Sequence, residues 1–235
     1  MTIVLMAIAG FAASFLLDPA IARLAREPYE RGEIEEDDLR LKKDGGAALE
    51  LSSETGALSM PRALTTGAIW RRLTVIVVTT ALFAVIGWRY DGDPAGLLVV
   101  SAYVAALIVC TGTDVLAYRV PNVITYPAIL GALAIGMVAD DANPADVWAG
   151  GLITGGVFLA MAIATRGGMG MGDVKLAFFT GFALGLTLGI QALLITAISG
   201  GIIATFLMVT RIRDRRDPIP YAPFIALGAL YVLLV

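Results

Sequence analysis

The sequence contains no histidine, and Cys110 is its only cysteine. These absences exclude a Ser-His-Asp or Cys-His catalytic arrangement, together with the common zinc sites built from histidine and cysteine ligands. A single cysteine also excludes a disulfide within the chain. Any hydrolytic chemistry must therefore rely on carboxylates, hydroxyls, lysine or a hard metal ion.

Charged residues are also scarce: they make up 16% of the 235 residues, whereas 58% are hydrophobic and the mean hydropathy is +0.81. This composition is typical of a membrane protein. A helix needs about 20 apolar residues to cross the hydrocarbon core. The apolar stretches predict an all-α polytopic membrane bundle of about eight transmembrane helices, at residues 2–24, 70–88, 95–114, 122–139, 146–165, 174–189, 190–210 and 221–235.

The basic residues predict the orientation of this bundle. With the N-terminus outside, the inner connections and adjoining helix ends hold every lysine and arginine of the sequence except Arg89. The positive-inside rule therefore places the N-terminus outside. We expect the first helix to be retained, because no basic residue precedes its apolar stretch as in a signal peptide. The inner connections are residues 25–69, 115–121, 166–173 and 211–220.

The predicted spans divide the chain into three parts. Residues 1–26 form the first transmembrane helix, residues 27–69 a cytoplasmic loop or small subdomain, and residues 70–235 the membrane-embedded core. The loop carries a run of acidic residues, 33–38. We interpret this run as a solvated charged segment, because its spacing matches no cation-binding loop. No metal site is predicted.

Three aspartates lie close to the predicted hydrocarbon, where an acidic side chain is costly and is a functional hypothesis by default. Asp114 ends the third span and Asp173 begins the sixth, so both lie at the inner membrane face. Two facing carboxyl groups can hydrolyse a peptide, because repulsion prevents both from ionising together. The alternative is two separate aspartates that pair with Arg119 or Lys175.

The third aspartate, Asp18, precedes Pro19, which we expect to break the first helix near the inner face. Arg23 is a candidate partner for its carboxylate. Small residues also recur at helical spacing, at Gly151 and Gly155 and at residues 181, 185 and 189. We interpret them as sites of internal helix packing rather than as a groove for a substrate helix.

Three motifs stand out in the sequence. The run from Thr113 to Asn122 has an aspartate six residues before Val-Pro-Asn, the run Gly170-Met171-Gly172-Asp173-Val174-Lys175-Leu176 follows, and residues 219–228 contain Pro-x-x-Pro-Phe. They resemble, in this order, the first catalytic motif, the second catalytic motif and the C-terminal segment of the prepilin leader peptidases. The resemblance covers roughly residues 70–235. The resemblance implies Asp114 and Asp173 as the catalytic pair, with a site shaped by Gly170, Gly172, Lys175, Pro121 and Asn122.

The resemblance further implies a membrane aspartyl endopeptidase of the type IV pilus or type II secretion apparatus. Its substrates would be prepilins or pseudopilins with an apolar N-terminal helix, cut at the cytoplasmic face of the inner membrane. No cofactor is needed, since water is the nucleophile. Membrane lipid is the other expected partner, and no nucleic acid is expected to bind. The formation of a homo-oligomer is left open.

Two alternative functions stay open at this point. An archaeal-type preflagellin peptidase is a close relative of the bacterial enzyme. A small proton-coupled transporter is the alternative from another class, because intramembrane carboxylates also serve as proton relays. We find no convincing inverted repeat of the kind that transporters often carry, which favours the peptidase.

The loop at residues 27–69 differs from the family pattern. Many prepilin peptidases carry paired Cys-x-x-Cys motifs there and also methylate the new N-terminus, whereas this loop has no cysteine. A zinc-bound subdomain is therefore excluded. We expect cleavage with little or no accompanying N-methyl transfer.

Overall fold

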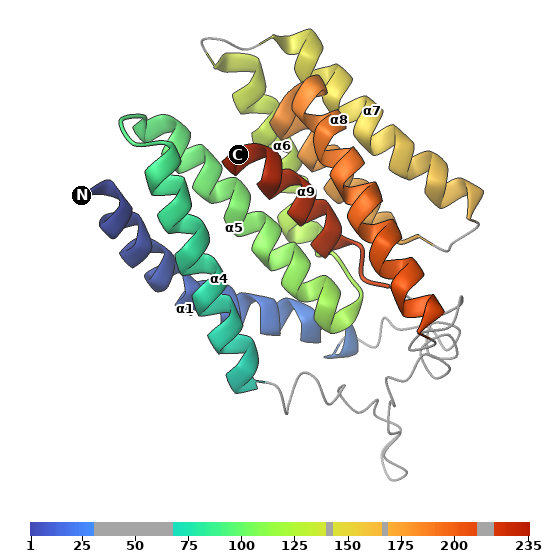
Figure 1. The fold of residues 1–235 in the computed structure, drawn as a ribbon, viewed down its shortest axis with the longest axis horizontal. Helices are drawn as coiled ribbons and strands as arrows, with labels where there is room; N and C mark the ends of the chain where they lie inside the picture. The colour runs from blue at the N-terminus through green and yellow to red at the C-terminus, as the bar shows by residue number, and fades with distance from the viewer. Residues whose placement is uncertain (31–67, 140–142, 166–168, 211–218) are drawn as a thin grey trace.

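The computed structural model describes residues 1–30, 68–139, 143–165, 169–210 and 219–235, and these residues contain helices but no strand. The prediction of an all-α protein is confirmed for them (Figure 1). Most of the predicted loop, residues 31–67, lies outside the described residues. The helices are α1 (Thr2–Glu30), α4 (Ala68–Arg89), α5 (Pro94–Ala117), α6 (Asn122–Val138), α7 (Pro144–Ala164), α8 (Met171–Val209) and α9 (Ala222–Leu234).

Five of these seven helices, namely α1, α4, α5, α7 and α8, are long and apolar enough to cross a membrane. Helix α6 has 17 residues and α9 has 13, so both fall short of a full span by length. The chain is therefore an integral membrane protein. The prediction of about eight separate spans is not reproduced in the described residues.

Helix α8 explains part of this difference. The sequence predicts separate spans at residues 174–189 and 190–210, whereas the structure has one 39-residue element with a non-helical residue, Gly185, at φ 74° and ψ −174°. A Cβ added at Gly189 would lie 3.6 Å from the Cα of Gly181, although residues eight apart in a straight helix are separated by about 12 Å. Helix α8 therefore folds back at Gly185, and its two halves correspond in position to the two predicted spans (Figure 1).

Helix α1 corrects a second expectation, because it continues through Pro19 to Glu30. A proline within a helix removes one backbone hydrogen bond, yet α1 stays helical through it and packs against α4 and α5. The buried carboxylate of Asp18 forms ion pairs with α4, at 2.7 Å from Arg71 Nε and 3.2 Å from Arg72 Nε. These ion pairs join α1 and α4 beside the proline.

Helix α7 packs on α8 through glycines. A Cβ added at Gly150 would lie 2.6 Å from the carbonyl oxygens of both Gly181 and Gly185, while Gly151 faces Phe182 and Gly155 faces the Phe178 ring. Small residues allow this close approach of two helix backbones. The interpretation of these glycines as internal packing sites is confirmed.

Different helix ends and connections lie at the two opposite ends of the bundle (Figure 1). At one end, Thr2 Oγ1 donates a hydrogen bond to Asp91 Oδ1 at 2.7 Å, and the Asp146 carboxylate accepts from the Leu186 N–H at 3.3 Å. This end holds the start of α1, the α4–α5 turn and the reversal of α8. The opposite end holds the end of α5 and the starts of α6, α8 and α9. Both Asp114 and Asp173 lie at this opposite end.

The backbone contact between α7 and α8 predicts that Gly150→Ala destabilises the protein. The added methyl group would overlap backbone atoms that cannot rotate away, and overpacking of this kind costs about 1–3 kcal/mol. Thermal unfolding in detergent measures the effect, with Gly156→Ala on the same helix as the control, because no atom lies within 4 Å of a Cβ added there. Equal unfolding temperatures for the two variants would contradict the packing described.

Candidate active site

Helix α5 places Asp114 near its C-terminal end, where the side chain is only 5% exposed. The helix ends at Ala117, and the next residue, Tyr118, has a left-handed conformation (φ 52°), while its N–H still donates to the Asp114 carbonyl at 2.8 Å. This conformation turns the chain sharply toward Pro121, the residue that precedes α6. The Asp114 carboxylate itself accepts a hydrogen bond from the Ala222 N–H at the start of α9, at 3.0 Å from Oδ2.

Helix α8 begins at the glycine motif and places Asp173 in its first turn, 8% exposed. A Cβ added at Gly172 would lie 2.9 Å from the Val120 Cβ and 3.3 Å from the Val120 backbone nitrogen. Gly172 therefore allows the start of α8 to approach the α5–α6 connection. Gly170 has an ordinary φ of −68°, so the left-handed conformation that the glycine run would permit is not used there.

Both aspartates line one cavity of about 490 Å³. Oδ1 of Asp173 is buried and has no hydrogen-bond partner among the described residues. The cavity is lined by all seven residues that the sequence singled out, namely Asp114, Pro121, Asn122, Gly170, Gly172, Asp173 and Lys175, and also by Leu24, Tyr118, Arg119, Val120, Val123 and Met171.

Lys175 pairs with neutral groups at the edge of this cavity. Its Nζ donates to Asn122 Oδ1 at 2.8 Å and lies 4.8 Å from the centroid of the Tyr126 ring. These contacts join α8 to the first turn of α6. Among the described residues, Lys175 therefore pairs with Asn122 rather than with either aspartate.

Sequence reasoning missed the contribution of Ala222. The Pro-x-x-Pro segment around it was recognised as a motif. The hydrogen bond to Asp114 comes from a backbone N–H, however, and because every residue type except proline has one, the sequence could not indicate this donor. Tyr118 and Leu24 also line the cavity without having been singled out, and Arg119, which lines it too, was named only as a possible partner of the aspartates. Tyr118 and Arg119 belong to the motif that contains Asp114, so their place in this motif could have indicated that they line the cavity.

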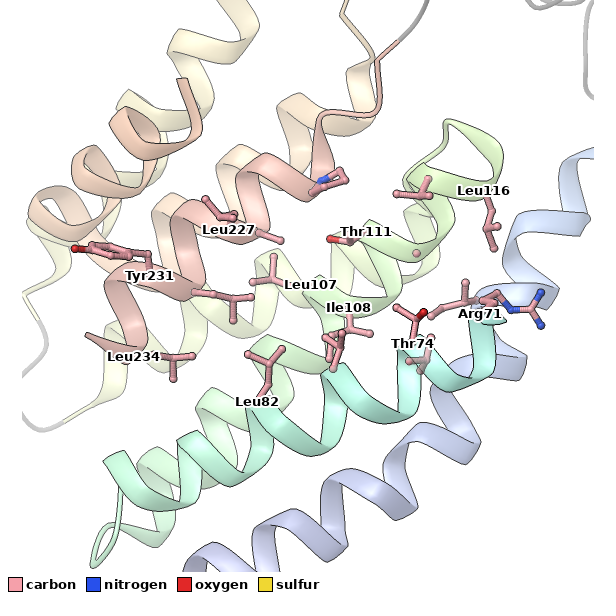
Figure 2. Close-up of a pocket in the computed structure, with 18 residues that line it drawn as sticks. Arg71, Thr74, Leu82, Leu107, Ile108, Thr111, Leu116, Leu227, Tyr231 and Leu234 are labelled. Carbon is pink, nitrogen blue, oxygen red and sulfur yellow. The ribbon is translucent and has the colours of Figure 1, made fainter. Parts of the chain in front are cut away.

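A second, larger hollow lies between α4, α5 and α9 and measures about 730 Å³ (Figure 2). Its walls are mainly aliphatic, with Leu82, Leu107 and Leu227 among the labelled residues. Arg71 and Tyr231 also line it, but no carboxyl group does. We call it the apolar groove. The two carboxyl groups that can transfer protons lie in the smaller cavity.

The fold and the cavity together define an all-α integral membrane protein with two neighbouring carboxyl groups at one end of its helical bundle. Residues 101–205 match the type IV leader peptidase family, so this part of the chain carries a domain of that family. The family resemblance of the sequence motifs is thereby confirmed. Both aspartates lie within the matched residues, whereas the Pro-x-x-Pro segment follows them.

Curated relatives carry the same family name. The chain is 32% identical to a prepilin leader peptidase/N-methyltransferase of Bacillus subtilis (strain 168) over 67% of this chain and 63% of the relative. It is 30% identical to the protein of that name from Aeromonas salmonicida (strain A449), over 71% and 59% of the two chains, and 28% identical to that of Aeromonas hydrophila, over 69% and 58%. The matches thus span about three fifths of these relatives. No solved structure matches the chain.

The close approach of Gly172 to Val120 predicts that two glycines of one motif tolerate alanine differently. Gly172→Ala should lower the unfolding temperature in detergent, because its methyl group would press on Val120 and overpacking costs about 1–3 kcal/mol. Gly170→Ala is the control, since its added Cβ would meet Asp173 Oδ2 at an ordinary 3.4 Å. Equal destabilisation by both variants would contradict the assigned contact.

Proposed function

We propose that this chain is a membrane aspartyl endopeptidase that cleaves the leader peptide of type IV prepilins or pseudopilins. Asp114 and Asp173 are its catalytic pair. The observation that carries the proposal is that both carboxyl groups line one cavity within a type IV leader peptidase domain. The other five motif residues surround them there.

The chemistry follows from two carboxyl groups that share one proton. The ionised group takes a proton from water, and the protonated group donates to the carbonyl oxygen of the scissile peptide bond. The resulting tetrahedral intermediate then expels the amine. A cavity of about 490 Å³ has the size of a typical ligand pocket. Lys175 and Asn122 are positioning residues in this proposal, because their hydrogen bond joins the helix of Asp173 to α6.

The proposed orientation has the N-terminus outside and the catalytic cavity at the cytoplasmic face of the inner membrane. The basic residues support it: Arg119 and Lys175 line the cavity, whereas Asp91 and Asp146 lie at the opposite end. A substrate with an apolar N-terminal helix would then present its leader to the cavity from the membrane. The eight-span arrangement, with the halves of α8 as separate spans, belongs to the same proposal.

The described structure does not favour the transporter alternative. Transporter sites lie near the bilayer midplane, between repeats, whereas this cavity is lined by residues at the end of α5 and at the starts of α6 and α8. A preflagellin peptidase would use the same aspartates on a different substrate. The two peptidases are distinguished by offering the purified protein both kinds of leader peptide.

The catalytic pair predicts that Asp114→Asn and Asp173→Asn each lower the rate of cleavage of a prepilin-type peptide by at least about 10²-fold. Each variant lacks one member of an acid–base pair, so the double variant should be little worse than either single one. Mass spectrometry of the timed digest gives the rates. Asp91→Asn, at the other end of the bundle, is the matched control and should cleave normally. Near wild-type cleavage by either site variant would refute the assignment.

The orientation predicts which positions an impermeant thiol reagent reaches in intact cells. In a Cys110→Ser background, Asp91→Cys should be labelled because it lies outside, and Gly45→Cys should be labelled only after the cells are lysed. The reverse pattern would place the cavity at the outer face and remove the basis for a cytoplasmic cut.

The loop at residues 27–69 predicts cleavage with little or no methyl transfer, because it has no cysteine to hold a structural metal. The matched relatives are named as peptidase and N-methyltransferase together, so the two activities need separate measurement. Mass spectrometry of the cleaved product, with S-adenosylmethionine supplied, separates them. A methylated N-terminal residue would contradict the prediction.

A further inference from the structure

The two aspartates of the cavity have unequal hydrogen bonding. Oδ2 of Asp114 accepts a hydrogen bond from the Ala222 N–H at 3.0 Å. Oδ1 of Asp173 is buried and has no hydrogen-bond partner among the described residues. A carboxylate that accepts N–H bonds is stabilised in its ionised form, whereas a buried carboxyl group without donors is not.

The donor on Asp114 is held by the packing of α9. Gly228 of α9 approaches the Ala192 carbonyl of α8 so closely that a Cβ would overlap it. Thr196 of α8 donates to the Ala192 carbonyl at 2.7 Å and to the Phe224 carbonyl of α9 at 3.2 Å. Another face of α9, with Leu227, lines the apolar groove (Figure 2). Helix α9 is therefore fixed on α8, with its N-terminus directed at Asp114.

We propose that the N-terminus of α9 assigns the roles of the two aspartates: Asp114 carries the negative charge and Asp173 carries the proton. Ala222 is a positioning residue that acts through its backbone N–H. The use of these charges in catalysis rests on the proposed function, but the charge distribution itself does not.

The dipoles of the aspartates' own helices act in the opposite sense. Asp114 lies near the negative C-terminal end of α5, and Asp173 lies in the positive first turn of α8. A direct hydrogen bond to a charged group contributes roughly threefold more than a helix dipole does, so the N–H of Ala222 decides the balance. The other titratable or charged groups nearby are Tyr118, Arg119 and Lys175 in the cavity, Cys110 one turn away on α5, and Tyr221 on the α9 side.

The assigned roles give a balanced reaction. Asp114 accepts a proton from water as the water oxygen bonds to the peptide carbonyl carbon, and Asp173 gives its proton to the carbonyl oxygen. The C–N bond then breaks while the amine nitrogen takes the proton held by Asp114. One hydroxyl of the intermediate returns its proton to Asp173, so both aspartates recover their starting states.

Replacing the Tyr221–Ala222 peptide bond by an ester tests the assignment, because the ester removes the Ala222 N–H and leaves every side chain unchanged. It also weakens the Tyr221 carbonyl as an acceptor for Phe224 and Ile225, so the control must be another ester in α9. We expect kcat to fall about tenfold with KM little changed, and the acidic limb of the kcat–pH profile to move up by about one pH unit. An ester at position 229 is the control, since it removes an N–H of α9 far from Asp114. A fall in kcat with an unmoved acidic limb, or no fall at all, would overturn the proposal.

Infrared titration provides a test that needs no peptidase activity. With the Asp114→Asn, Asp173→Asn double variant as the spectral blank, the Asp114 carboxylate band in Asp173→Asn should persist to lower pH than the Asp173 band in Asp114→Asn. The ester at position 222 should narrow this difference. Equal or reversed order would overturn the assignment. If the expected order were found but the wild type cleaved no prepilin-type peptide, the proposed function would fail and the charge assignment would stand.

Discussion

A hydrocarbon environment cannot solvate a carboxylate, and this constraint determines how the aspartates within the bundle are stabilised. Asp18 is neutralised by two arginines of α4, and Asp146 accepts a backbone N–H at the reversal of α8. Asp114 accepts the N–H at the start of α9. Oδ1 of Asp173 is buried without a hydrogen-bond partner in the described residues, and Asp173 lines one cavity together with Asp114. The unsatisfied group therefore lies where chemistry is proposed.

Physical patterns in the sequence predicted the fold class and which residues line the candidate site. Apolar runs fix helices in a membrane because every backbone group must be satisfied internally. Counting spans then places Asp114 and Asp173 at the same membrane face, because Asp114 lies near the end of α5 and Asp173 near the start of α8. The motifs added Pro121, Asn122 and Lys175, which line the same cavity as the aspartates.

The remaining features depend on tertiary contacts that residue types do not encode. Gly181, Gly185 and Gly189 look alike in the sequence, yet only Gly185 adopts the left-handed conformation that reverses α8. Pro19 was expected to break α1, but the helix continues through it to Glu30 and packs on α4 and α5. The N–H of Ala222 belongs to the backbone, and its role follows from where α8 holds α9.

The central claim is that both carboxyl groups contact the reacting carbonyl group together. A peptide with a hydroxyl-bearing tetrahedral isostere in place of the scissile bond tests it most directly, because a catalytic site binds such a mimic more tightly than the substrate. Calorimetry should show that the wild type binds the isostere more tightly than a matched peptide without the hydroxyl. Both Asp114→Asn and Asp173→Asn should lose this preference. An equal preference in the wild type and either variant would contradict the account.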